Sequence, residues 1–313
     1  MGTIGVLMSM ASNDPAVAGR QAAVQAALTS EGITSPTTSI QFGYAFDNFP
    51  GGNLQYGSEA DRLLQLANAN PPSSVFASCW NTMTSFQGSG NYRNHLITYA
   101  GLFHDGENNF GQYVAGVYSH MFQPCSQWVK LLKGAVPGLK NIGVIFDNVS
   151  ANAATNYYNY LQAAVSGAFT LFKIPIDQTV ASTGAVSALI NANLLTPHSG
   201  RTIANSGLIV PATAFTANRR SYIIQAANTL NLGAVYPNRM YVENASPYNG
   251  LISYGAILLD QYIIAGLTLA NSYKNPGMFA SGGTANANFE TVASQSRATA
   301  QHFTIPPGTI IVA

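Results

Sequence analysis

Short polar side chains recur where predicted strands end and helices begin. In the first half of the chain they follow the strand-like runs 3–10 and 75–78, and in the second half they follow the runs 141–146 and 207–210. Their hydroxyl, amide and carboxylate groups can hydrogen-bond a small molecule, and helix N-termini behind them offer backbone N–H groups. The same residue types are also common helix caps, so each of them can instead be structural. The candidate ligand-binding residues are Ser9, Met10, Ser12, Asp14, Trp80, Asn81, Thr82, Tyr118, Asn148, Ser150, Asn152, Thr213, Phe215 and Tyr254.

The aromatic candidates can contribute an apolar surface to such a site. Trp80 stands in a Ser-Cys-Trp-Asn-Thr turn between a strand and a helix, where its large ring must pack against something. The Trp80 ring can stack on a ligand or pack on the neighbouring strand, and the sequence does not distinguish these two roles. Tyr118, Phe215 and Tyr254 lie near predicted strand ends. The alternative to ligand contact for these three residues is packing in the core or at its rim.

Motifs for catalysis are weak or absent in the sequence. It contains no HExxH, Walker A, GxSxG or CxxC pattern, and the segment 250–255 misses a nucleophile elbow by one residue. The five histidines are scattered rather than paired at metal-ligand spacing. Asp14, Asp47 and Asp147 follow strands, where caps explain them as well as a catalytic pair does, and Cys79 has no identifiable histidine partner. We therefore expect no catalytic residues, no metal and no cofactor.

The elements that must position these residues alternate between strand-like and helical patterns. β-branched runs at 3–10, 39–45, 75–78, 141–146, 169–174 and 207–210 are separated by helical patterns. This alternation is typical of βαβ units on a parallel sheet. The helical patterns span residues 15–28, 59–69, 82 onward, 124–134, 153–165, 180–191 and 216–230, and a helix at 258–273 follows them.

Two such α/β sets follow one another, which predicts two Rossmann-like lobes with parallel sheets. A chain of 313 residues also exceeds the length of about 250 to 300 residues at which single cores stop growing. We expect an N-terminal lobe of residues 1–118 and 250–284, and a C-terminal lobe of residues 119–249 and 285–313. The last segments would then cross back between the lobes.

The composition limits the classes of partner that the chain can bind. Charged residues make up 8% of the chain and the net charge is +1, so no basic stripe of the kind that binds nucleic acid is present. The best apolar stretch, 254–269, is interrupted by Asp260 and Gln261, so we expect no membrane insertion. No signal peptide precedes the first strand, which indicates either a cytosolic protein or a signal peptide that has been removed. Cys79 and Cys125 do not settle the compartment.

One continuous segment of the sequence resembles a known protein family. Residues 128–146, WVKLLKGAVPGLKNIGVIF, followed by 148–152, are similar to the tryptophan/tyrosine-type family of ABC transporter substrate-binding proteins. In that family a similar Leu-Leu-Lys and Pro-Gly-Leu run leads into a Ser or Asn turn. Shorter matches in the same order lie at residues 5–9, 60–64, 208–211, 250–255 and 305–307.

This resemblance implies a type I periplasmic-binding-protein fold with a hinge of three crossovers and a ligand enclosed between the lobes. It places in the cleft all the candidates named above except Ser12, Asp14, Tyr118 and Phe215. The turn at 79–82 departs from the family, which usually has Gly-Thr there, and the stretches 88–95 and 196–206 look longer. The ligand preference of the family therefore does not transfer directly.

We expect a solute-binding protein of an ABC importer that delivers a small organic ligand to a membrane permease outside the cytoplasm, in the periplasm or an equivalent compartment. An aromatic or hydrophobic amino acid is the first candidate ligand, with Asp14 or Asp147 accepting from its ammonium group. A ligand-sensing domain of the same fold is one alternative. An α/β enzyme that acts in the cleft through an aspartate or Cys79 is the other.

Overall fold

The computed structural model divides the chain into two compact units. It describes residues 2–34, 38–45, 56–70, 73–89, 97–103, 114–120, 122–195, 199–243, 247, 249–275, 284–286, 289–294 and 310–312. The first unit comprises Met1–Asn48, Gly52–His120 and Ile257–Asn288, and the second comprises Phe49–Gly51, Met121–Ala256 and Phe289–Ala313. Each unit has its own sheet.

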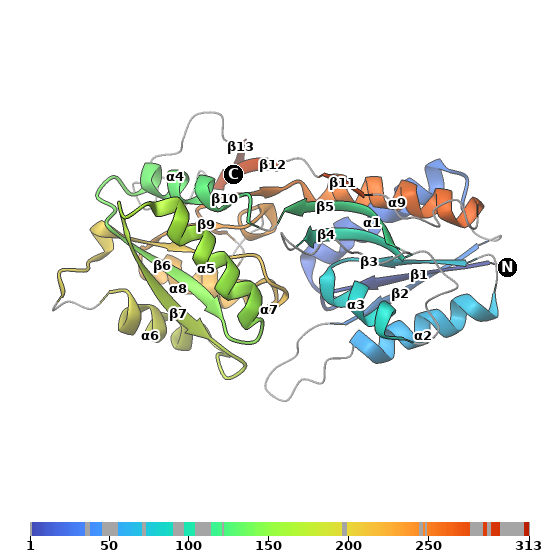
Figure 1. The fold of residues 1–313 in the computed structure, drawn as a ribbon, viewed down its shortest axis with the longest axis horizontal. Coiled ribbons are helices and arrows are strands. Elements are labelled where there is room, and N and C mark those ends of the chain that lie inside the picture. The colour runs from blue at the N-terminus through green and yellow to red at the C-terminus, as the bar shows by residue number, and fades with distance from the viewer. Residues whose placement is uncertain are drawn as a thin grey trace. The chain divides into compact units, whose positions relative to one another are not determined.

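The first unit is a parallel sheet with helices on both faces. In the order β11-β5-β4-β3-β1-β2, every described pair of neighbouring strands is parallel. The helices α1 and α9 lie side by side on one face, and α2 and α3 cover the other (Figure 1). The elements are β1 (Gly2–Met8), α1 (Pro15–Ser30), β2 (Thr38–Tyr44), α2 (Tyr56–Ala69), β3 (Ser73–Ala77), α3 (Trp80–Gly88), β4 (Ile97–Phe103), β5 (Val114–His120), α9 (Leu258–Lys274) and β11 (Thr284–Asn286).

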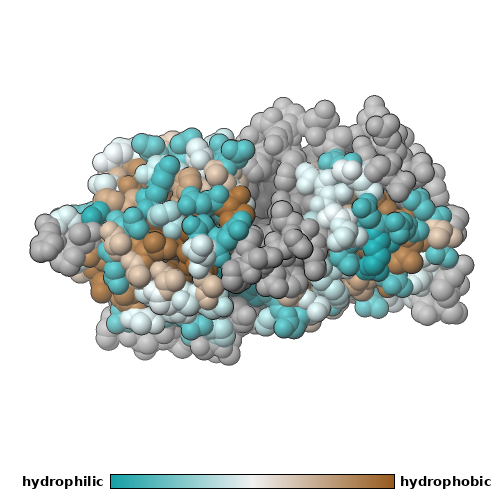
Figure 2. Space-filling model, turned by 90° about the horizontal axis from the view of Figure 1, so that it is seen from below, coloured by the Kyte–Doolittle hydropathy of each residue, from teal (hydrophilic) through white to brown (hydrophobic). Residues whose placement is uncertain are grey.

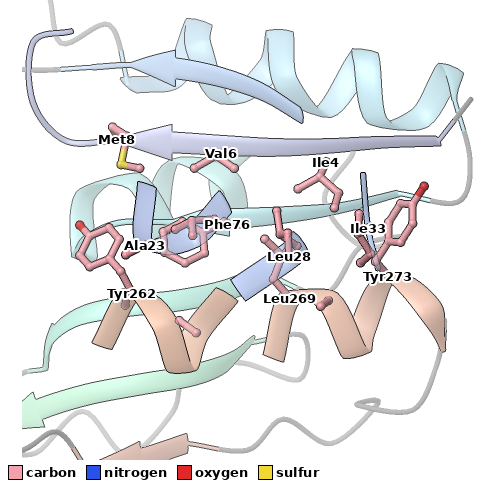
Figure 3. Packing of buried hydrophobic residues seen from close by; sticks show 14 residues of the cluster. Ile4, Val6, Met8, Ala23, Leu28, Ile33, Phe76, Tyr262, Leu269 and Tyr273 are labelled. Carbon is pink, nitrogen blue, oxygen red and sulfur yellow. The ribbon is translucent and has the colours of Figure 1, made fainter. Parts of the chain in front are cut away.

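Alternation along β1 explains how this sheet carries two cores. Ile4, Val6 and Met8 point toward α1 and α9, as Figure 3 shows, while Leu7 faces the layer that contains α2. Successive side chains of a strand point to opposite faces, so a strand covered on both faces must be apolar throughout. The strand-like run at the start of the sequence has that character, and every residue of β1 is buried.

The second unit repeats this architecture with additional strands at one edge. Its strand order is β13-β12-β10-β9-β8-β6-β7, in which β12 runs antiparallel to β10 and the other described pairs are parallel. On this sheet α4 packs with α5, and α6 packs with α8. The elements are α4 (Cys125–Ala135), β6 (Asn141–Asp147), α5 (Ala151–Val165), β7 (Thr170–Ile176), α6 (Thr183–Asn193), η3 (Ile203–Asn205), β8 (Ser206–Ile209), α7 (Ala214–Asn218), α8 (Arg220–Thr229), β9 (Gly233–Tyr236), η4 (Arg239–Tyr241), β10 (Ile252–Ala256), β12 (Phe289–Ser294) and β13 (Ile310–Val312).

The structure confirms the α/β class and the two parallel sheets, and it differs from the expected elements in four places. β5, β9, β11 and β12 were not predicted as strands. The helix expected over 216–230 is divided into α7 and α8, because Arg219 leaves helical geometry at φ −100° and ψ 6°. α2 begins at Tyr56, three residues before the start of the helical pattern expected at 59. β10 (Ile252–Ala256) pairs with β9 through Ile252 and Ser253 and belongs to the second unit, whereas the expected boundary at 250 placed it in the first lobe.

Figure 2 shows hydrophobic residues interspersed with hydrophilic ones on the visible face of the second unit. Within the described ranges, no helix has both the length and the apolar character needed to cross a bilayer. The same ranges contain no group of three or more His, Cys, Asp or Glu side chains placed to bind a metal ion.

Candidate functional site

The carboxyl ends of β1 and β3 lie next to each other and form a polar rim on the first unit. The backbone N–H of Ser9, just after β1, donates to the Ser78 hydroxyl just after β3, at 2.8 Å. Asp14 caps α1, its Oδ1 accepting from the N–H of Ala16 at 2.9 Å, which is the capping role named as its structural alternative. Met10 is buried behind this rim, while Ser12 is exposed. We call this set of residues, 9–14 and 78–82, the first rim.

A buried network from two distant helices fixes the first rim. The Tyr262 hydroxyl of α9 donates to the Ser78 carbonyl at 3.2 Å, and Arg20 Nη1 of α1 lies 3.4 Å from the same hydroxyl. The Arg20 guanidinium also lies over the Tyr262 ring, 5.4 Å from its centroid. Burial raises the pKa of Tyr262, and the positive charge of Arg20 opposes this rise. Tyr262 is therefore a neutral donor at physiological pH.

Arg20 and Tyr262 were not among the residues predicted for the site, although the sequence of α1 contains a signal for Arg20. Arg20 is the only charged residue in α1 and occupies the buried helix face together with Val17 and Val24. A lone arginine on an apolar stripe requires a buried partner, since an unpaired buried charge is costly. Helical spacing therefore identifies Arg20 as a positioning residue, while its partner on α9 requires the tertiary structure.

Cys79 and Thr82 form a capping box at the start of α3. The Cys79 backbone N–H donates to Thr82 Oγ1 at 2.9 Å, and this hydroxyl donates to the Cys79 carbonyl at 2.8 Å. Thr82 is fully buried, so its hydroxyl serves the cap. Cys79 is half-buried and its Sγ lies 3.7 Å from Thr82 Oγ1. Trp80 and Asn81 are the first two residues of α3, and their side chains lie outside the described residues.

We predict that Thr82→Val destabilises the chain by about 1 to 2 kcal/mol, because valine removes the cap hydroxyl in a buried turn. The free energy of unfolding in urea measures the effect, and Thr82→Ser, which keeps the hydroxyl, is the matched control. Equal stability of the valine and serine variants would contradict the capping role.

The second unit presents a corresponding rim at the carboxyl end of β6. Asp147 Oδ1 accepts from the backbone N–H groups of Val149 at 2.8 Å and Ser150 at 3.0 Å, which closes the turn into α5. Ser150 is the N-cap position of α5, and Asn148 and Asn152 are exposed beside it. Asp147 itself is 1% exposed, and among the residues that the structure describes its Oδ2 has no hydrogen-bond partner. Asp147 therefore shapes the turn that presents the two asparagines.

Thr213 and Phe215 extend this rim after β8, but their side chains are buried. The Thr213 hydroxyl accepts from the N–H of Thr216 at 3.0 Å, in a second capping box. Phe215 is fully buried, and the Arg219 guanidinium lies over its ring at 5.6 Å. Both residues lie where the sequence placed them, and their described contacts are those of a cap and a packed ring. We call residues 147–152, 213–215 and Tyr254 the second rim.

Tyr254 belongs to the second rim through β10. Its side chain is half-buried, and burial raises its pKa. Its carbonyl accepts from Trp128 Nε1 of α4 at 2.6 Å, which anchors β10 to the helix. Trp128 was noted in the sequence only as part of the segment that resembles a family motif, and this contact was not predicted. Tyr118 lies on β5, and its side chain is outside the described residues.

The chemistry of the two rims is that of neutral hydrogen bonding. Their described side chains are mainly hydroxyls and amides, and helix N-termini lie directly behind them. Such groups bind carboxylate, carbonyl or hydroxyl oxygens without carrying charge themselves. The five histidines of the chain lie outside the described side chains, so the expectation that Cys79 lacks a histidine partner remains a prediction.

No protein-family model and no curated protein sequence matches the chain. Among solved structures it is similar to an ABC domain in complex with L-Trp from Streptococcus pneumoniae, with a TM-score of 0.72, 16% identity, and coverage of 100% of this chain and 99% of that one. It is also similar to an ABC transporter solute-binding protein from Agrobacterium vitis bound with α-D-tagatopyranose, with a TM-score of 0.62, 10% identity and 96% of each chain covered. A LacI transcriptional regulator from Bacteroides fragilis gives a TM-score of 0.61 at 7% identity, covering 97% of this chain and 99% of that one. The chain therefore has the type I periplasmic-binding-protein fold that ABC transporter solute-binding proteins share.

Proposed function

We propose that the chain is the solute-binding protein of an ABC importer, which captures a small organic molecule between its two rims and releases it unchanged to a membrane permease. The observation that carries this proposal is the pair of rims. In each unit, capped helix N-termini and small polar side chains gather at the carboxyl ends of a parallel sheet. This is where open α/β sheets bind ligands. A ligand that contacts both rims favours a closed arrangement of the lobes.

We propose an aromatic or other hydrophobic amino acid as the ligand. The hydroxyls and helix N-termini of the rims suit a carboxylate, and we expect Trp80 and Tyr254 to contribute the aromatic surface for the body of the ligand. Asp14, which is half-buried, is the preferred acceptor for an ammonium group. Asp147 is fully buried and would have to become exposed to serve in the same way. The L-Trp complex of the pneumococcal structure supports this choice, and the tagatose complex shows that the fold also accommodates sugars.

Mass spectrometry of molecules that copurify with the chain tests the ligand class directly. Thermal-shift screening of amino acids, aromatic acids and sugars then ranks the candidates. The proposal predicts that the best ligand is recovered unchanged after incubation. Chemical conversion of the ligand would instead establish an enzyme.

We predict that Trp80→Ala weakens binding of the best ligand by about tenfold, which is about 1.4 kcal/mol, because it removes a stacking contact together with the apolar area buried in that contact. Isothermal titration calorimetry measures the dissociation constant. Tyr160→Ala is the control, since Tyr160 is an aromatic residue on α5 that is 44% exposed and stacks on Phe122. Unchanged affinity in the Trp80 variant would show that this side chain packs within its own unit.

We further propose that the chain works outside the cytoplasm, where an importer collects its solute, after removal of a signal peptide. Protease accessibility of the full-length precursor in intact spheroplasts tests this location. Co-purification with a permease expressed from a neighbouring gene tests the partner. Retention of the chain in the cytoplasm would contradict the transport role.

A ligand-sensing domain is the second candidate function, and the similarity to LacI regulators favours it. In that case binding of the same small molecule would signal to a regulator rather than deliver cargo. Reconstitution with a permease in proteoliposomes separates the two roles: uptake that depends on the chain supports transport. Binding without any chain-dependent uptake supports sensing.

A further inference from the structure

A glutamine near the start of α9 is buried with both ends of its carboxamide unpaired. Gln261 is 1% exposed, and neither its Oε1 nor its Nε2 has a hydrogen-bond partner among the described residues. Burial of a carboxamide without partners is costly, because neither end recovers the hydrogen bonds that it makes with water. An apolar side chain of the same size would pack there at a lower cost, which points to a use for the carboxamide.

The start of α9 lies at the first rim. The Tyr262 hydroxyl donates to the carbonyl of Ser78, directly after β3, whereas the hydroxyls of Ser272 and Ser74 lie 3.1 Å apart at the beginning of β3. α9 therefore runs antiparallel to β3 and begins at the carboxyl end of the sheet. Figure 3 accordingly shows Tyr262 at the Met8 end of β1.

The Gln261 side chain points toward the beginning of its helix. Helical side chains tilt toward the helix N-terminus and cover the turn that precedes their own Cα. Ala265, one turn further on the same face, packs in the core cluster that contains Phe76 of β3. Gln261 therefore occupies the sheet-facing side of α9, and its carboxamide is directed at the first turn of the helix.

The first turn of α9 offers unpaired backbone donors to the same place. Ile257 at the N-cap provides no side-chain cap, and the backbone N–H groups of residues 258–260 have no acceptor among the described residues. Such N–H groups, together with the helix dipole, bind an anionic oxygen. The half-buried carboxylate of Asp260 in this turn attracts a positive group. The first turn thus suits a molecule that carries both charges close together.

The zwitterionic end of an α-amino acid has the complementary groups. Its carboxylate accepts hydrogen bonds and its ammonium donates three, and both are attached to one carbon. Gln261 Nε2 can donate to this carboxylate while Oε1 accepts from the ammonium. Asp14 can accept a second ammonium proton, because α1 begins beside α9. A Cβ on Gly19 of α1 would lie 3.6 Å from Leu259 Cδ2 of α9.

We propose that Gln261, together with the uncapped first turn of α9, binds the zwitterionic end of an amino acid ligand. The inference rests on the proposed function and extends it, because it assigns the carboxylate and ammonium of the ligand to the first unit. A ligand that reaches the carboxamide displaces no hydrogen bond among the described residues. An amine without a carboxylate satisfies only part of this set of groups, so the site selects for the complete amino acid.

Isothermal titration calorimetry with two amino acids and their amines tests this selection. The probes are L-tryptophan and L-leucine, with tryptamine and isoamylamine as the counterparts that lack the carboxylate. Wild type is expected to bind at least one amino acid about tenfold or more tightly than its amine. Gln261→Met is expected to weaken that amino acid about tenfold or more, and the amine less, because hydrogen bonds to charged groups are lost. Gln65→Met, the same change at an exposed position of α2, is the matched control.

Thermal melts without ligand separate this role from a structural one. Gln261→Met is expected to keep or raise the midpoint of unfolding, since methionine is similar in size and has no unpaired polar group. Gln261→Glu gives a second test, because it keeps an acceptor, loses the donor and adds a negative charge. It is expected to weaken the amino acid about tenfold or more and to spare the amine.

Unchanged affinity for the amino acid in both Gln261 variants would overturn the proposal and assign the side chain to the core. Wild type that binds neither amino acid but binds a sugar would also overturn it, and would leave the importer function standing. Wild type that binds no compound of the thermal-shift screen would overturn the proposed function as well.

Discussion

Replacing Gly255 by alanine is expected to lower the free energy of unfolding by more than about 3 kcal/mol, above the usual cost of one added methyl group in a core. A Cβ at this position of β10 would lie 1.7 Å from the Pro237 carbonyl oxygen and 2.8 Å from its carbon. Both are backbone atoms, and Pro237 directly follows β9, which pairs with β10. The neighbour therefore cannot move away without breaking the strand pairing that holds the second sheet together.

Urea unfolding of Gly255→Ala against Gly57→Ala isolates this effect. Gly57 lies in α2 and a Cβ there meets no atom within 4 Å. Alanine in a helix is favoured over glycine by up to about 1 kcal/mol, so the control should be neutral or slightly more stable. Wild-type stability of the Gly255 variant would show that β10 does not approach Pro237 this closely.

Sequence patterns predicted the layered fold well where apolar runs are continuous. β1 and β6 are continuous apolar runs because helices cover both of their faces. Both were therefore predicted as buried strands, and the structure contains both. β5 and β9 were missed because VAGVYSH has only two β-branched residues and GAVY is only four residues long, so neither run stands out as a strand. β12 pairs antiparallel with β10 across a large sequence separation, which no local pattern encodes. Local periodicity thus identifies an element, while pairing of edge strands depends on the tertiary fold.

For the candidate site too, sequence patterns predict the position of a residue in an element, while its role depends on the tertiary structure. Asp14, Ser150 and Thr213 were predicted as candidates because they precede helices, and the structure places each at an N-cap position. Burial separates those that a solvent-borne ligand can reach from those that only cap: Asn148 and Asn152 are exposed, whereas Thr82 and Phe215 are not. Sequence alone cannot make this distinction, since a cap and a binding residue share the same chemistry and the same position.

Substitution of Trp128 is the second change for which we expect a large loss of stability. It is 1% exposed, packs against Tyr157 with ring centroids 5.8 Å apart, and its indole N–H donates to the Tyr254 carbonyl. Trp128→Ala is expected to destabilise the second unit by about 3 to 5 kcal/mol, because it opens a cavity in the core. Trp128→Phe keeps most of the ring and loses the hydrogen bond, so it should cost about 1 to 3 kcal/mol.

The phenylalanine variant also separates positioning from packing at the second rim. If the indole N–H fixes β10, then Trp128→Phe should raise the hydrogen-exchange rate of the β10 amides more than that of the β6 amides. Leu131→Ala is the control, since Leu131 is a buried residue of the same helix without a polar contact to β10 among its described interactions. Equal increases in both strands for both variants would mean that Trp128 stabilises the unit as a whole. A selective increase in β10 would assign Trp128 the placement of Tyr254, through a hydrogen bond to the backbone of the residue itself.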